Sequence, residues 1–104
     1  MYLFAWQSPI LDGALKAVHC MEIAFVFNNI ARNREQSGDS REAYVLADKM
    51  SRAWGQFAKT GDPNSEGLPE WPEYNEADGA TMFFDNKCEV RPGFDKELME
   101  FIQQ

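Results

Sequence analysis

A continuous apolar run near the N-terminus constrains the fold of this chain most strongly. Residues 2–6 read Tyr-Leu-Phe-Ala-Trp, and Ser8 and Pro9 end the run. Short unbroken apolar runs are typical of strands that are covered on both faces, as in the parallel sheets of α/β proteins. No repeated strand–helix pattern follows that would supply parallel neighbours for this strand. We therefore expect an α/β segment whose first strand lacks the neighbours that it needs.

The longest helix is predicted in the middle of the chain, because apolar residues recur there at three- and four-residue steps and so share one face. These residues are Ala43, Leu46, Ala47, Met50, Trp54, Phe57 and Ala58. Asp39 is the predicted N-cap, and Glu42 can complete a capping-box-like exchange with the free amides. Gly61 ends the helix, and Pro63 follows it. About twenty residues give a helix of roughly 30 Å.

Shorter elements are predicted on both sides of this helix. A heavily buried helix should occupy about residues 20–32, and Trp71 and Tyr74 should pin the polar stretch that follows the long helix to the body. A β-hairpin is predicted over residues 81–91. The chain should end in a helix over residues 94–102, whose apolar side chains share one side.

The composition indicates one globular domain over residues 1–104. The hydrophobic content of 44% with 26% charged residues favours packing over disorder. The net charge of −7, with scattered lysines and arginines, disfavours binding to nucleic acid or to an anionic membrane, because both need a basic patch. No apolar run approaches the roughly 18 residues of a transmembrane helix. There is no signal peptide, but a segment that starts within a fold would have lost one, so the compartment stays open.

His19 is the only histidine, and the residues after it form an informative ordered series. Residues 19–27 read His-Cys-Met-Glu-Ile-Ala-Phe-Val-Phe, residues 54–64 read Trp-Gly-Gln-Phe-Ala-Lys-Thr-Gly-Asp-Pro-Asn, and residues 71–74 read Trp-Pro-Glu-Tyr. This series resembles the C-terminal part of the type-B carboxylesterases, the α/β-hydrolase family that includes p-nitrobenzyl esterases and cholinesterases. The resemblance covers nearly the whole chain. It implies that the chain is the C-terminal segment of an α/β-hydrolase fold.

The resemblance also implies a reaction, in which a carboxylic ester is hydrolysed through an acyl-serine intermediate without a metal or cofactor. His19 aligns with the family's catalytic histidine and would be general base and then general acid, which suits an imidazole because its pKa lies near neutrality. The implied partners are the remainder of the hydrolase domain and a small-molecule ester. The Trp-rich segments after residue 54 would be structural.

The other members of a triad are not expected in this chain. In α/β-hydrolases the order is nucleophile, acid and then histidine, with the serine in G-x-S-x-G. Only eighteen residues precede His19, and that motif does not occur; the nearest string, residues 38–42, reads better as a helix start. Ser8 and Asp12 lie upstream on one short loop without a glycine-rich oxyanion segment, so a local triad with His19 is a poor candidate. We expect the chain alone to be inactive.

Two positions near His19 are informative. The resemblance puts Glu22 in the polar network beneath the active site, whereas a plain alternative is an exposed carboxylate favoured by a helix N-terminus. The family usually has glycine where Lys16 stands, and lysine adopts positive φ only at a cost. Either the histidine loop differs in shape or the parent belongs to a divergent branch.

The sequence offers no metal site or disulfide framework. One histidine with Glu22 and the distant Cys20 and Cys88 makes no set of zinc ligands, and two cysteines form no disulfide framework.

Two rival functions remain open at this point. One is a free-standing, non-catalytic interaction domain that kept the pattern of a hydrolase tail. The other is a small hydrolase that uses His19 with local partners. The absence of a G-x-S-x-G motif argues against it. If the chain is a hydrolase segment, its unpaired strand and its apolar helix faces should make it self-associate in isolation. The sequence does not select an acyl or alcohol group.

Overall fold

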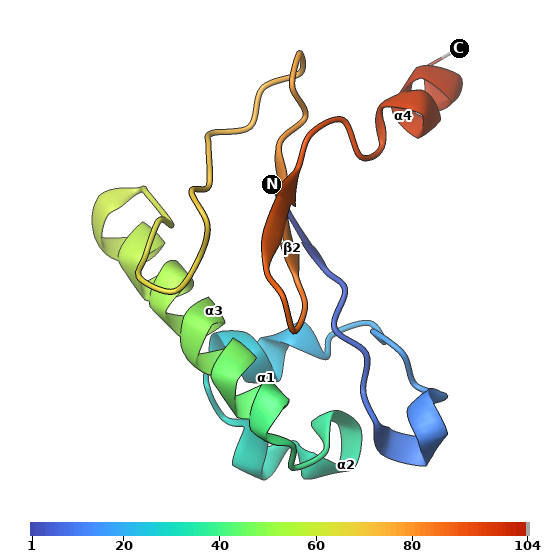
Figure 1. Cartoon of the computed structure of the whole chain (residues 1–104), viewed down its shortest axis with the longest axis vertical. Helices are drawn as coiled ribbons and strands as arrows, with labels where there is room; N and C mark the ends of the chain where they lie inside the picture. The colour runs from blue at the N-terminus through green and yellow to red at the C-terminus, as the bar shows by residue number, and fades with distance from the viewer. Residues whose placement is uncertain (104) are drawn as a thin grey trace.

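The computed structural model describes residues 1–103, so the last residue of the expected domain, Gln104, lies outside the described part. One long helix runs along one flank of the molecule, and the short strands and the other helices lie beside it (Figure 1). In chain order the elements are β1 (Tyr2–Phe4), the 3-10 helix η1 (Ile10–Gly13), α1 (Glu22–Val26), the 3-10 helix η2 (Ile30–Arg32), α2 (Arg34–Ser37), α3 (Arg41–Thr60), β2 (Thr81–Phe84), β3 (Glu89–Arg91) and α4 (Lys96–Ile102).

The three strands form one small sheet in the order β1–β2–β3. β1 runs parallel to β2, with Tyr2 opposite Met82 and Phe4 opposite Phe84. β2 and β3 form the predicted antiparallel hairpin. The expectation that β1 lacks its neighbours is therefore wrong for one edge, because the long segment between α3 and β2 returns the chain alongside β1. The other edge of β1 is the end of the sheet in the described residues.

The core lies between the sheet and the helices α1 and α3. Phe84 is fully buried on the helix side of β2, whereas Phe83, on the opposite face by strand alternation, packs against Phe94 with ring centroids 4.7 Å apart. Phe25 of α1 lies 5.0 Å from the ring of Phe4 and so joins α1 to β1. The buried cluster comprises Trp6, Met21, Ala24, Phe25, Ile30, Ala43, Leu46, Ala47, Met50, Ala53, Trp71, Met82 and Phe84.

The long helix α3 begins one residue later than the sequence suggests. Ser40 is the N-cap, and its hydroxyl accepts a hydrogen bond from the Ala43 amide at 3.2 Å. Asp39 instead accepts a hydrogen bond from the Tyr44 hydroxyl at 2.6 Å. Because Ala43 occupies the third helical position, the expected capping box does not form. Gly61 ends the helix with φ 79, as predicted.

The helix predicted over residues 20–32 is divided in two. α1 ends at Val26, Asn28 adopts a left-handed φ of 50, and η2 follows as a separate turn. Asparagine tolerates that conformation better than most residues, which explains the break.

Trp71 anchors the polar segment after α3 as expected, since it is buried and its indole N–H donates to the Met1 carbonyl at 3.2 Å. Tyr74 does not, because 39% of it is exposed.

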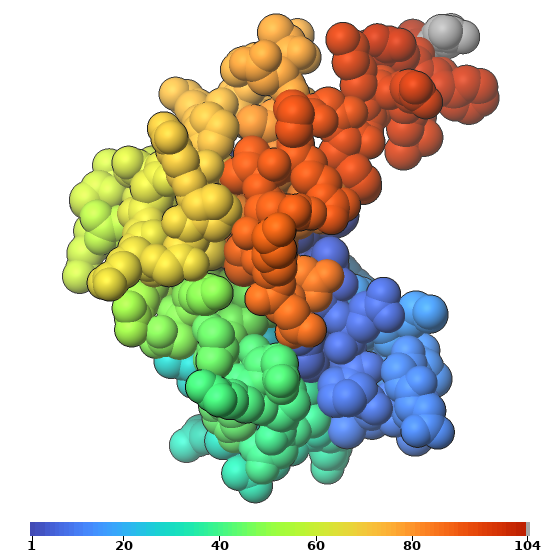
Figure 2. Space-filling view, viewed as in Figure 1, coloured from blue at the N-terminus to red at the C-terminus, as the bar shows by residue number. Residues whose placement is uncertain are grey.

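The described chain leaves more surface exposed than a self-contained domain of its size. Its accessible area is 7199 Å², whereas a folded monomer of 11.9 kDa exposes about 5,900 Å². Its radius of gyration is 14.6 Å, compared with about 13 Å for a domain of this length. The C-terminal segment projects from the body in Figure 2. The exposed large hydrophobic residues are Met1, Tyr2, Leu3, Leu11, Val18, Ile23, Phe27, Tyr44, Val45, Phe57, Tyr74, Phe94, Leu98, Met99, Phe101 and Ile102.

α4 and the last turns of α3 account for part of this exposed surface. α4 contains no buried residue, although its apolar side chains share one side as predicted. Phe57 in α3 is 56% exposed, so the predicted apolar face of α3 is only partly covered. Within residues 1–103, none of the helices combines the length and the apolar character needed to cross a bilayer.

Candidate functional site

The segment after β1 is a loop whose two ends are tied together before it reaches His19. The Ser8 amide donates to the Lys16 carbonyl at 3.1 Å, and the Lys16 amide donates to the Gly13 carbonyl at 3.1 Å. The buried Ser8 hydroxyl donates to the Gln36 carbonyl, which fastens the loop to α2. The loop therefore leaves the carboxyl end of a parallel strand in a fixed path. α/β proteins commonly place reactive side chains at such strand ends.

Lys16 adopts the left-handed conformation that a glycine would adopt at low cost. Its φ is 49. The histidine loop therefore does not avoid a positive φ at this position, which was one of the two alternatives considered. The hydrogen bonds of Lys16 to Ser8 and Gly13 hold the residue in place.

His19 sits at the tip of a tight turn between this loop and α1. The Met21 amide donates to the Val18 carbonyl at 3.1 Å, which closes the turn, and Cys20 has φ 69. A positive φ at the third turn position is a feature of type II turns. Met21 is fully buried and anchors the turn, whereas the His19 side chain is exposed. The imidazole is thus presented at the surface by a well-anchored backbone.

The structure does not assemble a local triad around His19. The Ser8 hydroxyl is buried and bonded to the Gln36 carbonyl, so its proton is not offered to an imidazole. Asp12 is exposed on η1 with φ 55. No hydrogen bond among residues 1–103 joins His19 to Ser8 or Asp12. These observations agree with the absence of a G-x-S-x-G motif, which already made a local triad a poor candidate.

Glu22 follows one turn after His19 and is half-buried at the start of α1. The pKa of the Tyr2 phenol in β1 is raised, mainly because the ring is partly buried and also because of the negative charge of Glu22. Glu22 is therefore only partly exposed to solvent. α1 has only five residues, so its N-terminus is too short to decide between the two interpretations of Glu22. The role of Glu22 beneath an active site stays a prediction.

The cysteines are free thiols in different surroundings. Cys20 is exposed beside His19, and Cys88 is half-buried next to β3. Burial raises the pKa of the Cys88 thiol, although its hydrogen bond to the Asp85 carbonyl and the charge of Lys49 oppose this shift. Among residues 1–103, no three histidine, cysteine or carboxylate side chains lie close enough to bind a metal ion together.

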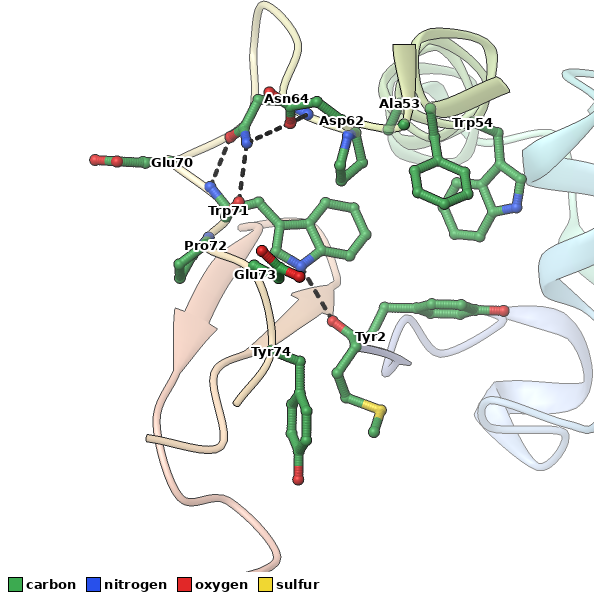
Figure 3. A pocket seen from close by; sticks show the side chains of 14 residues that line it. Tyr2, Ala53, Trp54, Asp62, Asn64, Glu70, Trp71, Pro72, Glu73 and Tyr74 are labelled. Atoms are coloured by element: carbon green, nitrogen blue, oxygen red, sulfur yellow. Dashed lines mark hydrogen bonds between the residues drawn. The ribbon is translucent and has the colours of Figure 1, made fainter. Parts of the chain in front are cut away.

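A hollow that the sequence analysis did not foresee lies on the helix side of the sheet, beside the start of β1 (Figure 3). We call it the aromatic groove; its volume is about 940 Å³. Its lining residues are Met1, Tyr2, Ala53, Trp54, Phe57, Gly61, Asp62, Pro63, Asn64, Glu70, Trp71, Pro72, Glu73 and Tyr74. The Trp-rich segments that supply its aromatic residues were expected to be structural. Trp71 is indeed buried, whereas Phe57 and Tyr74 are exposed. The lining includes neither His19 nor Glu22.

The groove is shaped by one rigid turn after α3. The Asn64 side chain accepts from the Trp71 amide at 2.7 Å and donates to the Trp71 carbonyl at 2.9 Å. Asp62 accepts from the Asn64 amide and side chain, and these hydrogen bonds lower the pKa of Asp62. The Gly-Asp-Pro-Asn sequence thus brings Trp71 back onto the core, where its ring lies 5.6 Å from that of Phe84.

Comparison with known proteins supports one family. The model of the carboxylesterase family matches residues 1–102. Among individual relatives, phenmedipham hydrolase of Pseudarthrobacter oxydans is 39% identical over 85 residues, which are 78% of this chain and 17% of the relative. Para-nitrobenzyl esterase of Bacillus subtilis is 33% identical over 92 residues, which are 86% of this chain and 18% of the relative.

Solved structures give the same result. An esterase from Clostridium hathewayi, described as able to hydrolyse aliphatic aromatic polyesters, superposes with a TM-score of 0.84 at 37% identity. The match covers 98% of this chain and 20% of the esterase. A thermophilic p-nitrobenzyl esterase superposes with a TM-score of 0.83 at 30% identity, over 96% of this chain and 21% of the other. The chain thus spans about a fifth of the relatives that it matches and has the fold of an α/β-hydrolase segment. By sequence and by structure, it belongs to the carboxylesterase family.

Proposed function

We propose that this chain supplies the general base of a serine carboxylesterase, with His19 as the residue that carries the proton. The observation that carries the proposal is the anchored turn that presents His19, in a chain of the carboxylesterase family. An imidazole exposed on a fixed backbone can take a proton from a serine hydroxyl and return it to the leaving alcohol. Glu22, half-buried at the start of α1, would orient the surrounding polar groups.

The remaining catalytic groups would come from the rest of a hydrolase domain, which is the partner that we propose. Relatives of this chain are about five to six times as long as the segment that they share with it. The nucleophilic serine, the acidic member of the triad and the oxyanion donors belong to that remainder. The substrate would be a small-molecule carboxylic ester. The 104-residue chain alone should hydrolyse p-nitrophenyl acetate no faster than its His19→Ala variant.

A single-chain chimera tests the role of His19. In it, this sequence replaces the matching fifth of the Clostridium hathewayi esterase. His19→Ala should lower kcat by several orders of magnitude, because loss of any triad member has an effect of that size. Added imidazole should restore part of the activity, which a purely structural role would not allow. Val18→Ala, at the exposed neighbouring position, is the control and should retain activity. A loss below about tenfold in His19→Ala is too small for a general base and would overturn the proposal.

The rival, a free-standing interaction domain, is less well supported. A self-contained domain of this mass would expose roughly 1,200 Å² less surface than this chain does. Genomic context separates the two functions: an open reading frame that continues upstream of Met1 and encodes G-x-S-x-G favours the esterase, whereas a natural translation start at Met1 favours the rival.

A further inference from the structure

We infer that Ser8 is a positioning residue for ester hydrolysis: its buried hydroxyl and its amide fix the loop that presents His19, and so determine how well the imidazole meets the serine and the leaving alcohol. The inference rests on the proposed function, in which His19 is the general base. Only 1% of Ser8 is exposed, so it acts through His19 rather than on a substrate.

The Ser8 hydroxyl joins two segments that are distant in the sequence. It donates to the Gln36 carbonyl in α2, 28 residues away, and it accepts from the Ile10 amide at 3.1 Å. Both bonds are made at a buried side chain, where an unpaired polar group is costly. Removing the hydroxyl would leave the Gln36 carbonyl without this donor and would release the loop from α2.

The backbone of Ser8 carries this attachment toward His19. The Ser8 amide donates to the Lys16 carbonyl at 3.1 Å. Lys16 is three residues before His19, so at most about 11 Å of backbone separates them. Lys16 also has φ 49, and a residue with a Cβ keeps such a conformation only where its surroundings enforce it. We call the bonds of Ser8 to Gln36 and Lys16 the Ser8 joint.

The Ser8 joint is one of two anchors on either side of His19. The other is Met21, two residues after His19, which is fully buried. The His19 side chain itself is exposed, so its position depends on the backbone that these anchors hold. In catalysis a misplacement of about 1 Å can lower the rate by about 100-fold. Loss of the first anchor would allow movements of that size.

Packing at the end of α2 supports the same joint. Gly38 follows α2 directly, and a Cβ placed on it would lie 3.1 Å from Cγ of Pro9, the residue after Ser8. That separation is shorter than an ordinary van der Waals contact. The loop and α2 are therefore in close contact beside the Ser8 hydroxyl, and α2 can act as a fixed support for the loop.

Ser37 offers a matched comparison for a purely structural role. It is also fully buried, and its hydroxyl donates to the Asn33 carbonyl at 2.9 Å. That bond spans only four residues and stays within the α2 region, whereas the Ser8 bond reaches the histidine loop. Ser8→Ala and Ser37→Ala thus remove similar buried hydroxyl groups, but only the first disturbs the Ser8 joint.

Kinetics of the single-chain chimera test the role of Ser8. Ser8→Ala should lower kcat/KM per folded molecule for an ethyl ester by about 10- to 100-fold. The loss should be smaller for the p-nitrophenyl ester of the same acid. Ethoxide needs a proton from the imidazole to leave, whereas p-nitrophenolate does not, so a displaced histidine impairs both proton transfers for the first ester and one for the second. Ser37→Ala should leave both rates close to those of the unsubstituted chimera.

Hydrogen exchange in the unsubstituted chimera provides a test that needs no variant. The Ser8 and Lys16 amides donate to the Lys16 and Gly13 carbonyls, so they should exchange at least about tenfold more slowly than in an unstructured peptide. In Ser8→Ala the Lys16 amide should exchange faster. Exchange of both amides at the unstructured rate in a fully active chimera would show that His19 works without the Ser8 joint, even if Ser8→Ala does not fold.

Two kinetic outcomes would also overturn the inference. A folding defect lowers the rates for both esters by the same factor, so equal losses in Ser8→Ala would leave Ser8 with a structural role only. Equal effects of Ser8→Ala and Ser37→Ala would have the same meaning. The proposed function fails separately: an active His19→Ala chimera would reject both, whereas an inactive His19→Ala beside a fully active Ser8→Ala would reject the positioning role alone.

Discussion

β1 and β2 are neighbouring strands with similar apolar sequences but very different surroundings. All four residues of β2 are buried, and Met82 and Phe84 have no exposed surface. In β1, which pairs with it in register, Tyr2 and Leu3 are each more than a third exposed. β2 has a strand on each side and the core beneath it, whereas β1 has one strand and an open edge. Packing within the described residues therefore accounts for only part of the apolar character of β1.

The same contrast holds between α3 and α4. The apolar stripe of α3 packs against α1 and, through Trp54, against Phe84 of β2. The buried part of that stripe runs from Ala43 to Ala53. The stripe of α4 meets little of the chain, and Phe101 is 74% exposed. Packing within the chain is thus concentrated in its middle, while β1, the aromatic groove and α4 form its uncovered parts.

Substitutions in the two strands should give the largest measurable difference. Phe84→Ala should lower the free energy of unfolding by about 3–5 kcal/mol, because the ring is fully buried among Tyr2, Trp54 and Trp71. Leu3→Ala should cost less than about 1 kcal/mol in the isolated chain, since the side chain is partly solvated already. Urea denaturation followed by tryptophan fluorescence measures both.

A control sharpens that comparison. Phe84→Leu keeps most of the buried volume, so it should lower the free energy of unfolding less than Phe84→Ala does. The leucine variant can also be measured if the alanine variant does not fold. In the chimera, Leu3→Ala should become more costly than in the isolated chain. Equal costs for Leu3→Ala and Phe84→Ala in the isolated chain would contradict the difference in burial.

The uncovered parts should make the isolated chain self-associate. Exposed strand edges and large apolar patches recruit other chains. Light scattering coupled to size exclusion should therefore give a mass above 11.9 kDa at micromolar concentrations. The rest of a hydrolase domain, supplied as a separate polypeptide, should disperse these species if it competes for the same surfaces. A stable 11.9 kDa monomer with a cooperative melt and no binding of an apolar dye would instead favour the free-standing domain.

The sequence predicted the elements better than their environments. The stripe of α3, the glycine at its end and the hairpin were all recognisable, because each depends on residues close together in the chain. The pairing of β1 with β2 was not, because Tyr2 and Met82 are eighty residues apart and no periodic signal connects them. The N-cap was assigned to Asp39 rather than Ser40, since both residues can accept from a free amide.

The candidate site was predictable only in part and for the same reason. The position of His19 after a strand was visible in the sequence, and the family resemblance marked Lys16 as a usual glycine position. The positive φ of Cys20 was not predicted, since cysteine does not signal a left-handed conformation. The aromatic groove was not predicted, because large rings such as those of Trp71 and Phe57 usually pack in a core. Only the structure separates a buried ring such as Trp71 from an exposed one such as Phe57.

The two cysteines should report the difference between covered and uncovered regions. Burial raises the pKa of the Cys88 thiol, so less of it is thiolate at pH 8, and its alkylation should be slower than that of the exposed Cys20 by about tenfold or more. Because the pKa is raised, the alkylation rate of Cys88 should climb only at higher pH than that of an exposed thiol. Mass spectrometry after iodoacetamide treatment measures both sites. In urea the two rates should become similar, and similar rates in the folded chain would contradict the burial of Cys88.

The smallest expected effect concerns the His19 loop, which combines an anchored backbone with an exposed side chain. Lys16 has φ 49, a conformation that costs a residue with a Cβ about 1–2 kcal/mol and costs glycine much less. Lys16→Gly should therefore raise the free energy of unfolding, by about 1 kcal/mol or less because glycine also gains freedom in the unfolded chain. Lys16→Ala is the matched control: it removes the same charge but keeps the Cβ. If both variants stabilise equally, the charge is the cause, and the left-handed backbone at Lys16 carries no measurable strain.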